Sequence, residues 1–146
     1  MAANTQPIFP LTPKVSWGTL TNSNILKDGT GTTVSTIFTA GVDGSRIDQI
    51  KIRPLGTNSA TVVRFFINNG STNATATNNS LIHEVTVAAS TVSEIAALTD
   101  YNVTITVNTS ETIPPIPYLP ANYKINATIG TTASAGLQIT IHGGDY

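Results

Sequence analysis

Chemically reactive side chains are scarce in this chain, and their spacing does not assemble a catalytic set. The sequence contains two histidines, His83 and His142, and no cysteine. His83 stands beside Glu84 in a run with strand-like alternation, and neighbouring side chains of a strand point to opposite faces, so these two residues cannot form an acid–base dyad with each other. A small hydrolase would require that His83, His142 and an acid converge in one pocket. We therefore expect that the protein is not an enzyme and has no catalytic residues.

Metal and cofactor sites are not indicated either. A zinc site needs three or four His or Cys ligands, and two histidines without cysteine do not supply them. Calcium would need clustered oxygen donors, but no EF-hand spacing links the scattered residues Asp28, Asp43, Asp48 and Asp100. The glycine-containing segment 29–31 lacks the lysine and the following helix of a phosphate-binding loop. We expect no metal ligand and no cofactor.

Composition limits the classes of protein to which the chain can belong. Its 146 residues suffice for one domain with a sizeable core. Only 10% of the residues are charged and the net charge is −1, so counterion release could contribute little to nucleic-acid binding. The start of the sequence has no basic region followed by an apolar one, and no apolar run approaches the ~18 residues of a membrane span. We expect synthesis in a cytoplasm, with neither nucleic acid nor membrane as a partner.

Short β-type runs separated by turn residues dominate the chain from Val15 onward. The densest is Ala60 to Gly70, whose Val, Ile and Phe side chains fit a strand that is covered on both faces. The eight predicted strands lie within residues 15–20, 34–40, 46–55, 60–70, 81–87, 101–107, 123–129 and 137–141. This count predicts an all-β, antiparallel two-sheet sandwich of jelly-roll type. An immunoglobulin-like sandwich is the alternative, although its Cys…Trp…Cys spacing is missing.

Four local features of these runs can be predicted as well. We expect Trp17 to face the core, and we expect the run Arg46 to Leu55 to be the antiparallel neighbour of Ala60 to Gly70, because a short connection joins them. Arg64 needs an acid or a carbonyl partner if it is buried. The capping-box spacing of Thr91 and Glu94, ahead of the apolar residues 95–98, predicts one or two helical turns there.

Two proline-rich segments carry large apolar side chains. Residues 1–14 contain three prolines at even spacing and cannot be helical, so they predict an extended N-terminal arm before a single domain at 15–146; a disordered terminus is the alternative. Residues 113–120 form the second segment. Large apolar side chains in extended segments suit protein contacts. We hypothesise a protein interface that contains six residues, namely Ile8, Phe9, Leu11, Ile116, Tyr118 and Leu119.

Two stretches of the sequence resemble a known family. Ile52 to Gly70 and Leu119 to Gly130, together with the final Gly-Gly-Asp-Tyr, are similar to small structural proteins encoded beside the capsid genes of tailed bacteriophages. The resemblance covers most of the chain after Val34. It implies a cement or decoration protein on the capsid exterior, which binds the major capsid protein, stabilises the shell and forms a homo-oligomer, with a trimer expected. The family supplies no catalytic residues.

A competing hypothesis is a carbohydrate- or receptor-binding module of a tail fibre or head fibre. Sandwiches of this size can bind sugars through exposed aromatic side chains. Aromatic residues make up only 6% of this sequence, and Trp17 lies in a predicted strand. Both observations weigh against the sugar-binding hypothesis.

Overall fold

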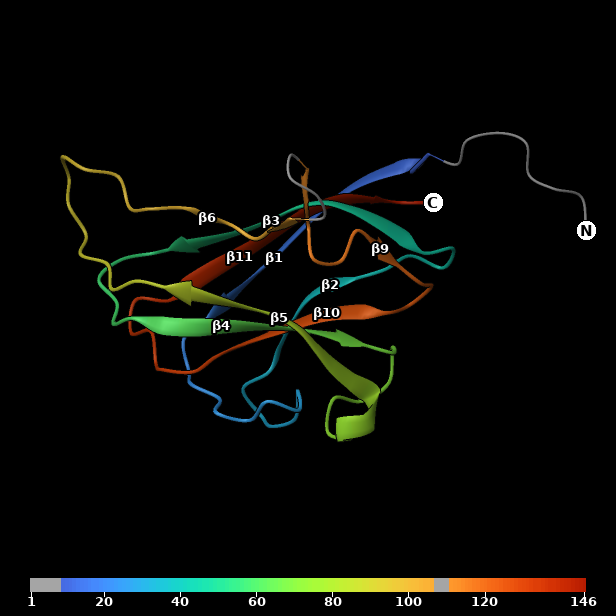
Figure 1. The fold of residues 1–146 in the computed structure, drawn as a ribbon, viewed down its shortest axis with the longest axis horizontal. Helices are drawn as coiled ribbons and strands as arrows, with labels where there is room; N and C mark the ends of the chain where they lie inside the picture. The colour runs from blue at the N-terminus through green and yellow to red at the C-terminus, as the bar shows by residue number, and fades with distance from the viewer. Residues whose placement is uncertain (1–8, 107–110) are drawn as a thin grey trace, which may run out of the picture.

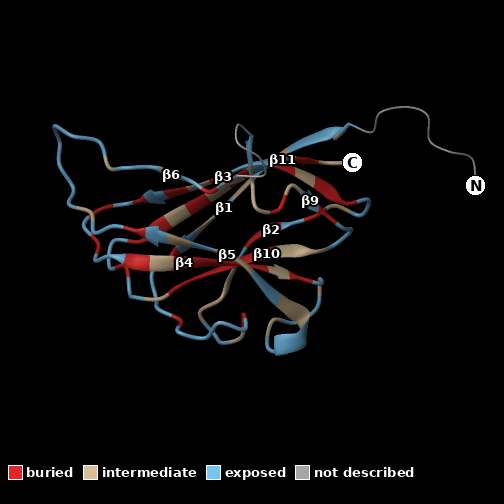
Figure 2. Ribbon diagram, viewed as in Figure 1, coloured by how far each residue is buried: buried red, intermediate tan, exposed pale blue. Residues whose placement is uncertain are grey.

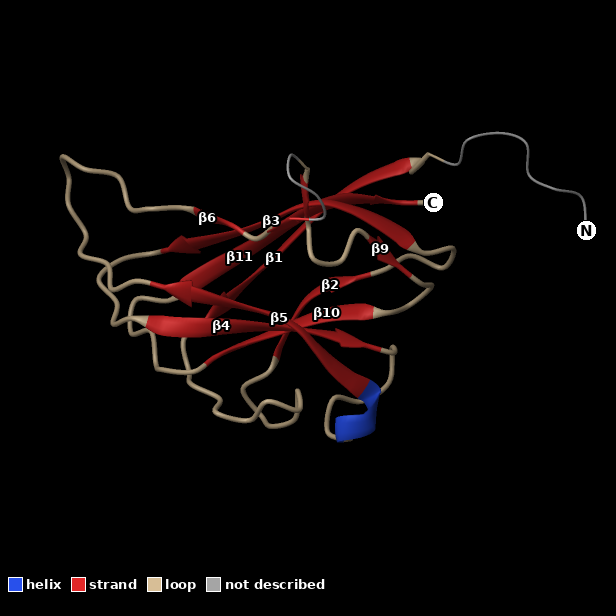
Figure 3. Cartoon of the chain, viewed as in Figure 1, coloured by secondary structure: helices blue, strands red, loops and turns tan. Residues whose placement is uncertain are grey.

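In the computed structural model the regular secondary structure is β-strand apart from one short 3-10 helix, and residues 9–106 and 111–146 are described (Figures 1 and 3). The strands are β1 (Thr12–Leu20), β2 (Ser35–Thr39), β3 (Ser45–Pro54), β4 (Thr61–Asn68), β5 (Asn79–Val87), β6 (Tyr101–Asn102), β7 (Ile105–Thr106), β8 (Thr112–Ile113), β9 (Tyr118–Leu119), β10 (Lys124–Ile129) and β11 (Leu137–Asp145). One short 3-10 helix, η1 (Ala76–Asn78), precedes β5. In the part of the chain that is described, no helix is long and apolar enough to cross a membrane.

The strands form two antiparallel sheets that pack face to face (Figure 1). The sheet that we call the β1 sheet has the order β1-β11-β3-β6, and β9 also pairs with β3. The β4 sheet has the order β2-β10-β4-β5, and β7 and β8 form a separate hairpin. The predicted all-β antiparallel sandwich is therefore confirmed. Between β1 and β4 each connection crosses from one sheet to the other, as it does in a jelly roll, and the jelly-roll subtype stays a prediction.

The core lies between the two sheets, where the facing sides of the strands are buried (Figure 2). It is built mainly from β-branched and aromatic side chains, which pack well on a pleated surface. Its largest fully buried members are Phe38, Phe65, Ile37, Ile50, Ile52, Ile125, Ile129, Leu137, Ile139, Ile141 and Val63.

Strand β4 is central and is covered on both faces, as its composition predicts. Val63 and Phe65 belong to the core between the sheets. The side chains that alternate with them, among them Arg64 and Phe66, are buried on the opposite face. The predicted partners of Arg64 are both present, because its Nε donates to Glu84 Oε1 at 2.8 Å and its Nη1 donates to the Asn24 carbonyl oxygen at 3.1 Å.

The loop between β1 and β2 covers the outer face of the β4 sheet (Figure 1). Gly29 in this loop has a φ of 76°, and a Cβ at this position would lie 3.1 Å from Phe66 Cδ1 and 2.7 Å from Asn79 Cβ. Glycine therefore permits both the turn and the close approach of the loop to the sheet. The amide of Asn68 completes this covered layer by donating to Asn79 Oδ1 at 2.8 Å.

The predicted pairing of Arg46 to Leu55 with Ala60 to Gly70 is wrong. Strand β3 pairs with β11, β6 and β9, whereas β4 pairs with β10 and β5. The short connection crosses between the sheets instead of forming a hairpin. Buried Asn58 holds this crossing, because its side chain donates to the Gly136 carbonyl at 3.0 Å and accepts from the Ala135 N–H at 2.8 Å.

The predicted helical turn before residue 98 is also wrong. Residues 91–100 form a loop, and Ile95, which should have anchored a helical turn, is 98% exposed. Two backbone N–H groups of this loop have side-chain hydrogen-bond partners. The Ile95 N–H donates to Ser93 Oγ of the same loop at 3.2 Å, and the Val92 N–H donates to Thr57 Oγ1 of the β3–β4 connection at 3.1 Å. A single helical turn with no surface to pack against does not form, because helix nucleation is unfavourable.

The N-terminal boundary of the sandwich differs from the predicted boundary at residue 15. Strand β1 already begins at Thr12, and the Leu11 N–H donates to the Asp145 carbonyl at 2.9 Å. Residues 12–14 are therefore strand residues rather than part of an arm. Of the remainder of the predicted arm, residues 9–11 are described and residues 1–8 lie outside the described residues, so the arm stays a prediction.

Candidate interaction surface

The outer face of the β1 sheet carries a row of apolar side chains along its edge strand. Lys14 of β1 points toward the β4 sheet, because its Nζ donates to the Thr39 carbonyl in β2 at 2.7 Å. Strand alternation therefore turns the residues at odd positions outward. These side chains form the edge row, which consists of Leu11, Pro13, Val15, Trp17 and Thr19, and all five residues are exposed.

The prediction that Trp17 faces the core is wrong, because Trp17 is 64% exposed. The inward side of β1 has little room at this end. A Cβ on its inward neighbour Gly18 would lie only 2.8 Å from Ile37 Cδ1. The Lys14, Ser16 and Leu20 side chains fill the other inward positions. The only tryptophan of the chain is thus presented to the outside at the sheet edge.

Polar side chains occupy the rest of this face. In the strand register Trp17 lies opposite Thr140 of β11, which in turn lies opposite Lys51 of β3. One step along the sheet, Val15 lies opposite His142. The apolar edge row is therefore bordered by a hydroxyl, an imidazole and an ammonium group.

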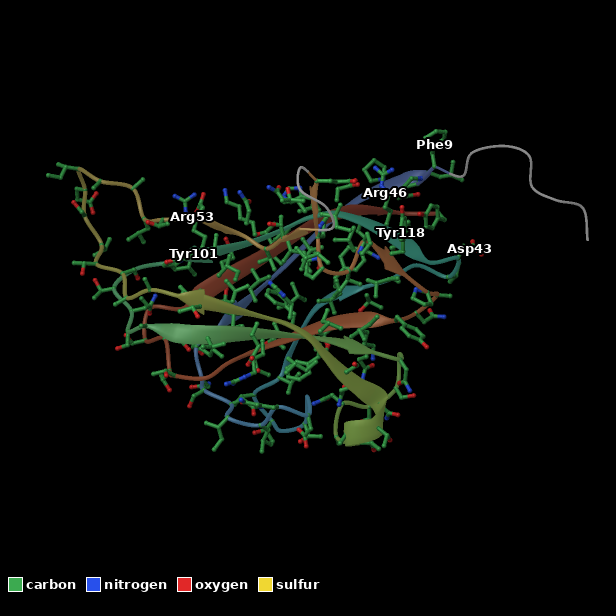
Figure 4. All side chains as sticks on the ribbon, in the orientation of Figure 1. Phe9, Asp43, Arg46, Arg53, Tyr101 and Tyr118 are labelled. Atoms are coloured by element: carbon green, nitrogen blue, oxygen red, sulfur yellow. The ribbon has the colours of Figure 1, made fainter. Side chains whose placement is uncertain are left out.

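The cations at the far end of the face are paired. Asp100 lies 2.6 Å from Lys51 Nζ and 3.6 Å from Arg53 Nε, measured from its carboxylate oxygens. Figure 4 shows Arg53 and Tyr101 at this end of the molecule, away from Phe9, Arg46 and Tyr118. Since these ion pairs are exposed, they add little to stability. They do reduce the positive charge on this part of the face.

The opposite end of the face contains a shallow hollow of about 270 Å³. Its lining residues are Phe9, Pro10, Pro13, Arg46, Asp48, Gly143 and Gly144. Arg46 Nε donates to Asp48 Oδ1 at 2.7 Å, and this hydrogen bond and the Asp48 charge raise the pKa of Arg46. Tyr118 lies opposite Arg46 in the register and is 66% exposed, and Phe9 is 65% exposed (Figure 4). Two exposed aromatic side chains therefore stand near one paired guanidinium.

A carboxylate on the inner side of the β1 sheet connects several strands at this end. Asp145 of β11 accepts hydrogen bonds from Lys14 Nζ at 2.9 Å, from the Ser45 hydroxyl and from the Gly41 N–H at 3.3 Å. Partial burial by itself would raise the pKa of Asp145, but the hydrogen bonds from Ser45 and Lys14 and the Lys14 charge outweigh it and lower the pKa. The carboxylate thereby links β1, β3 and β11 in its ionised form.

The six residues of the hypothesised interface do not lie together. Ile8 is outside the described residues, and Phe9, Leu11 and Tyr118 are exposed as the hypothesis requires. Ile116 and Leu119 are only 5% and 3% exposed and belong to the core. Prolines keep the segment 113–120 extended, but they do not keep its apolar side chains outside the core. These two residues are not available to a partner in this structure.

Sequence reasoning missed several members of the surface. Val15, Trp17 and Arg46 lie on this face, and none of them was in the hypothesised interface. The signal was the alternation of β1, in which the even positions Lys14 and Ser16 look more polar than the odd ones. Side-chain polarity predicts that Lys14 and Ser16 face solvent, but both face inward. Their polar groups are accommodated there because they donate to carbonyl and carboxylate oxygens at the edge of the sandwich.

The potentially reactive side chains are far apart in the topology. His83 lies on β5 of the β4 sheet, whereas His142 is exposed on the outer face of the β1 sheet. Glu84 is engaged by Arg64. Among residues 9–106 and 111–146, no group of three or more His, Cys, Asp or Glu side chains is arranged to hold a metal ion. The convergence that a hydrolase would need is not present in the described part of the chain.

Comparisons with known proteins give one structural neighbour to report. No family model matches the chain, and no curated protein matches it. The chain is similar to a chain of the cyanophage Pam1 capsid asymmetric unit, with 16% sequence identity and a TM-score of 0.34 over 98% of this chain and 91% of that chain.

Proposed function

We propose that the protein is a structural subunit of a phage virion, and more specifically a cement or decoration subunit that binds the outer surface of the major capsid shell and stabilises it. The observation that carries the proposal is the outer face of the β1 sheet, where Phe9 is exposed at the hollow and Tyr118 is exposed opposite Arg46, which also lines the hollow. Apolar side chains grouped on the surface of a soluble domain mark protein contacts. The resemblance of Ile52 to Gly70 and Leu119 to Gly130 to capsid-associated proteins supports the capsid as the partner.

The chemistry of the hollow suits a protein partner. Phe9 and Tyr118 offer apolar area, and the Arg46–Asp48 pair offers donors and acceptors at the edge without a net charge. Protein interfaces combine an aromatic or apolar centre with a polar rim in this way. An apolar or aromatic side chain of the capsid protein would fill the hollow. The proposal assigns no catalytic activity to the chain.

The test uses capsids from a virus in which the gene for this protein has been deleted. Purified protein is added, and its occupancy on the particles is measured by sedimentation and by particle reconstruction. Phe9→Ala and Tyr118→Ala should each lower the apparent affinity about tenfold, because exposed aromatic side chains at interfaces contribute strongly to binding. Ile95→Ala is the matched control, since Ile95 is 98% exposed on the loop between β5 and β6.

Point substitutions are preferable to deletion of residues 2–13. That deletion would remove Thr12 and Pro13 from β1 and break the Leu11–Asp145 hydrogen bond, so it would damage the sandwich itself. Unchanged occupancy of both aromatic variants would reject the hollow as the capsid contact. No density for the protein on reconstituted particles would reject the capsid function.

One observation favours the second candidate function, a carbohydrate-binding module. Trp17 is exposed beside Thr140 and near His142. Its location in a strand therefore does not keep it from contacting a sugar. A flat aromatic ring next to hydroxyl and imidazole groups is a plausible platform for a sugar ring. A glycan array probed with the purified protein would support this function if binding is seen and is lost in Trp17→Ala.

A further inference from the structure

We infer that strand β1 pairs, antiparallel, with β1 of a second copy of this chain, about a two-fold axis that lies midway between the Val15 residues of the two copies. The pairing would join two β1 sheets into one continuous sheet. The inference goes beyond the capsid function and does not rest on it, because it concerns the isolated protein.

The free edge of β1 is long, and no other strand pairs with it in the described part of the chain. β1 contains nine residues, stands at the end of the β1 sheet, and pairs with β11 in one uninterrupted register. Natural edge strands are usually blocked by charges, bulges, short length or proline, because unpaired backbone groups invite another strand. β1 carries two such features, Pro13 in the edge row and the inward-pointing Lys14, whose charge is paired with Asp145. The edge row itself carries no charged side chain.

The long edge strand of the other sheet shows what protection looks like. β5 also has nine residues and stands at the end of the β4 sheet. Its pairing with β4 is interrupted by a register shift between Phe65 and Phe66, and it presents the charged Glu84. Both features discourage pairing with a further strand. β1 has no register shift in its ladder and no charge in its outward row.

The edge row is complementary to itself about Val15. With the two-fold axis at this residue, Val15 lies opposite the Val15 of the second copy, and Pro13 lies opposite Trp17. Leu11 then lies opposite Thr19. Directly opposite side chains of an antiparallel pair have Cβ atoms about 4.5–5.5 Å apart, so an indole ring can pack on a proline ring at this spacing.

The inward side of the same register avoids like charges. Lys14 lies opposite Ser16 of the second copy, and a lysine directly opposite itself would be destabilising. The Lys14 ammonium is in addition paired with Asp145 at 2.9 Å. A second copy therefore fits this edge, since an isologous contact requires one patch that is complementary to itself. The net charge of −1 per chain adds little repulsion between copies.

Cross-linking tests the register directly, because the chain contains no cysteine. In a dimer of the Val15→Cys variant, the Cα atoms of the two substituted residues would lie within the Cα–Cα range that a disulfide spans. Oxidised glutathione should convert the pair to a disulfide and be reduced to two glutathione thiols, which gives a dimer band on a non-reducing gel. Thr19→Cys is the matched control in the same row. In the proposed register the two copies of position 19 would lie about 27 Å apart, so this variant should form no disulfide. Mixing Leu11→Cys protein with Thr19→Cys protein should give the mixed dimer.

Mass measurement in solution provides the second test. In the protein without substitutions, the fraction of dimer should rise with protein concentration. Val15→Lys should weaken self-association about tenfold or more, because two ammonium groups would face each other. Thr86→Lys on exposed β5 should leave self-association unchanged. A Val15→Cys protein that stays monomeric under oxidation, or a self-association that Val15→Lys does not change, would overturn the inference. Either failure would leave the capsid-binding result of Tyr118→Ala untouched.

Discussion

The outer face of the β4 sheet is covered by the chain's own loops, whereas the outer face of the β1 sheet is open in the described part of the chain. On the covered face, Arg64 bonds to Glu84 and to the Asn24 carbonyl, and Phe66 is fully buried. On the open face, Trp17 and Val15 are exposed. The two sheets belong to one sandwich and share one core. The outer side of the β4 sheet still presents Leu81 of β5, which is 37% exposed, whereas the β1 sheet presents Val15 and Trp17, which are 51% and 64% exposed.

The difference indicates which side of the molecule is built for contact. Loops that fold back on a sheet satisfy its polar groups and bury its aromatic side chains, so they leave less of that sheet for a partner. In the described part of the chain the outer face of the β1 sheet lacks such a cover. Trp17 is exposed on its edge strand, Phe9 at the hollow, and Tyr118 opposite Arg46. The comparison predicts that substitutions on the covered face act on stability and that substitutions on the open face act on assembly.

The largest expected effect is on the covered face. Phe66→Ala should lower the free energy of unfolding by about 3–5 kcal/mol, as much as Phe65→Ala in the core between the sheets, because both rings are fully buried. Urea denaturation followed by circular dichroism measures the change. A loss below about 1 kcal/mol for Phe66→Ala would mean that the loop does not hold the covered face closed.

A smaller effect is expected where the covering loop approaches the sheet. Gly29→Ala should cost about 1–2 kcal/mol for the positive φ, plus the crowding of its Cβ against Asn79. Gly130→Ala is the control, since its Cβ would come no nearer than 3.4 Å to any atom. Both are measured by the same denaturation series. Equal stabilities of the two variants would contradict the close contact between loop and sheet.

The next effect concerns acid stability at the edge of the open sheet. The pKa of Asp145 is lowered in the folded protein, so its ionised form contributes stability above the usual value of 3.8, and this stability is lost as the pH falls through the lower folded value. Asp145→Asn should reduce stability at neutral pH by about 1 kcal/mol and flatten the dependence of stability on pH below 3.8. Thermal unfolding between pH 2 and pH 7 measures it. An unchanged acid limb in the variant would show that Asp145 is not the group responsible.

The smallest effect on stability is expected on the open face. Trp17→Ala should change the free energy of unfolding of the monomer by no more than about 0.5 kcal/mol, because the side chain is largely exposed. The same variant should weaken self-association, because Trp17 lies opposite Pro13 of the second copy in the proposed pairing. A loss of several kcal/mol in dilute protein would show that Trp17 packs within its own chain and would remove the contrast between the faces.

Much of the fold could be predicted from local sequence. The run Ala60 to Gly70 predicted a central strand that is covered on both faces, and the buried Arg64 has both kinds of partner that it was predicted to need. The pairing of that strand was not predictable from the short connection, because Asn58 bonds to the segment around Gly136 and turns the chain into the other sheet. Capping-box spacing at Thr91 failed for a similar reason, since no surface is present for the helix to pack on.

The candidate site was less predictable than the fold. Of the hypothesised interface, Phe9, Leu11 and Tyr118 are exposed, but Ile116 and Leu119 fill the core although they stand among the same prolines. The sequence by itself determined the strand periodicity, the low charge and the scarcity of His and Cys, because these depend only on residue types and their spacing. Tertiary structure alone decided which sheet is covered and which way Trp17 points, because both depend on contacts between segments that are distant in the chain.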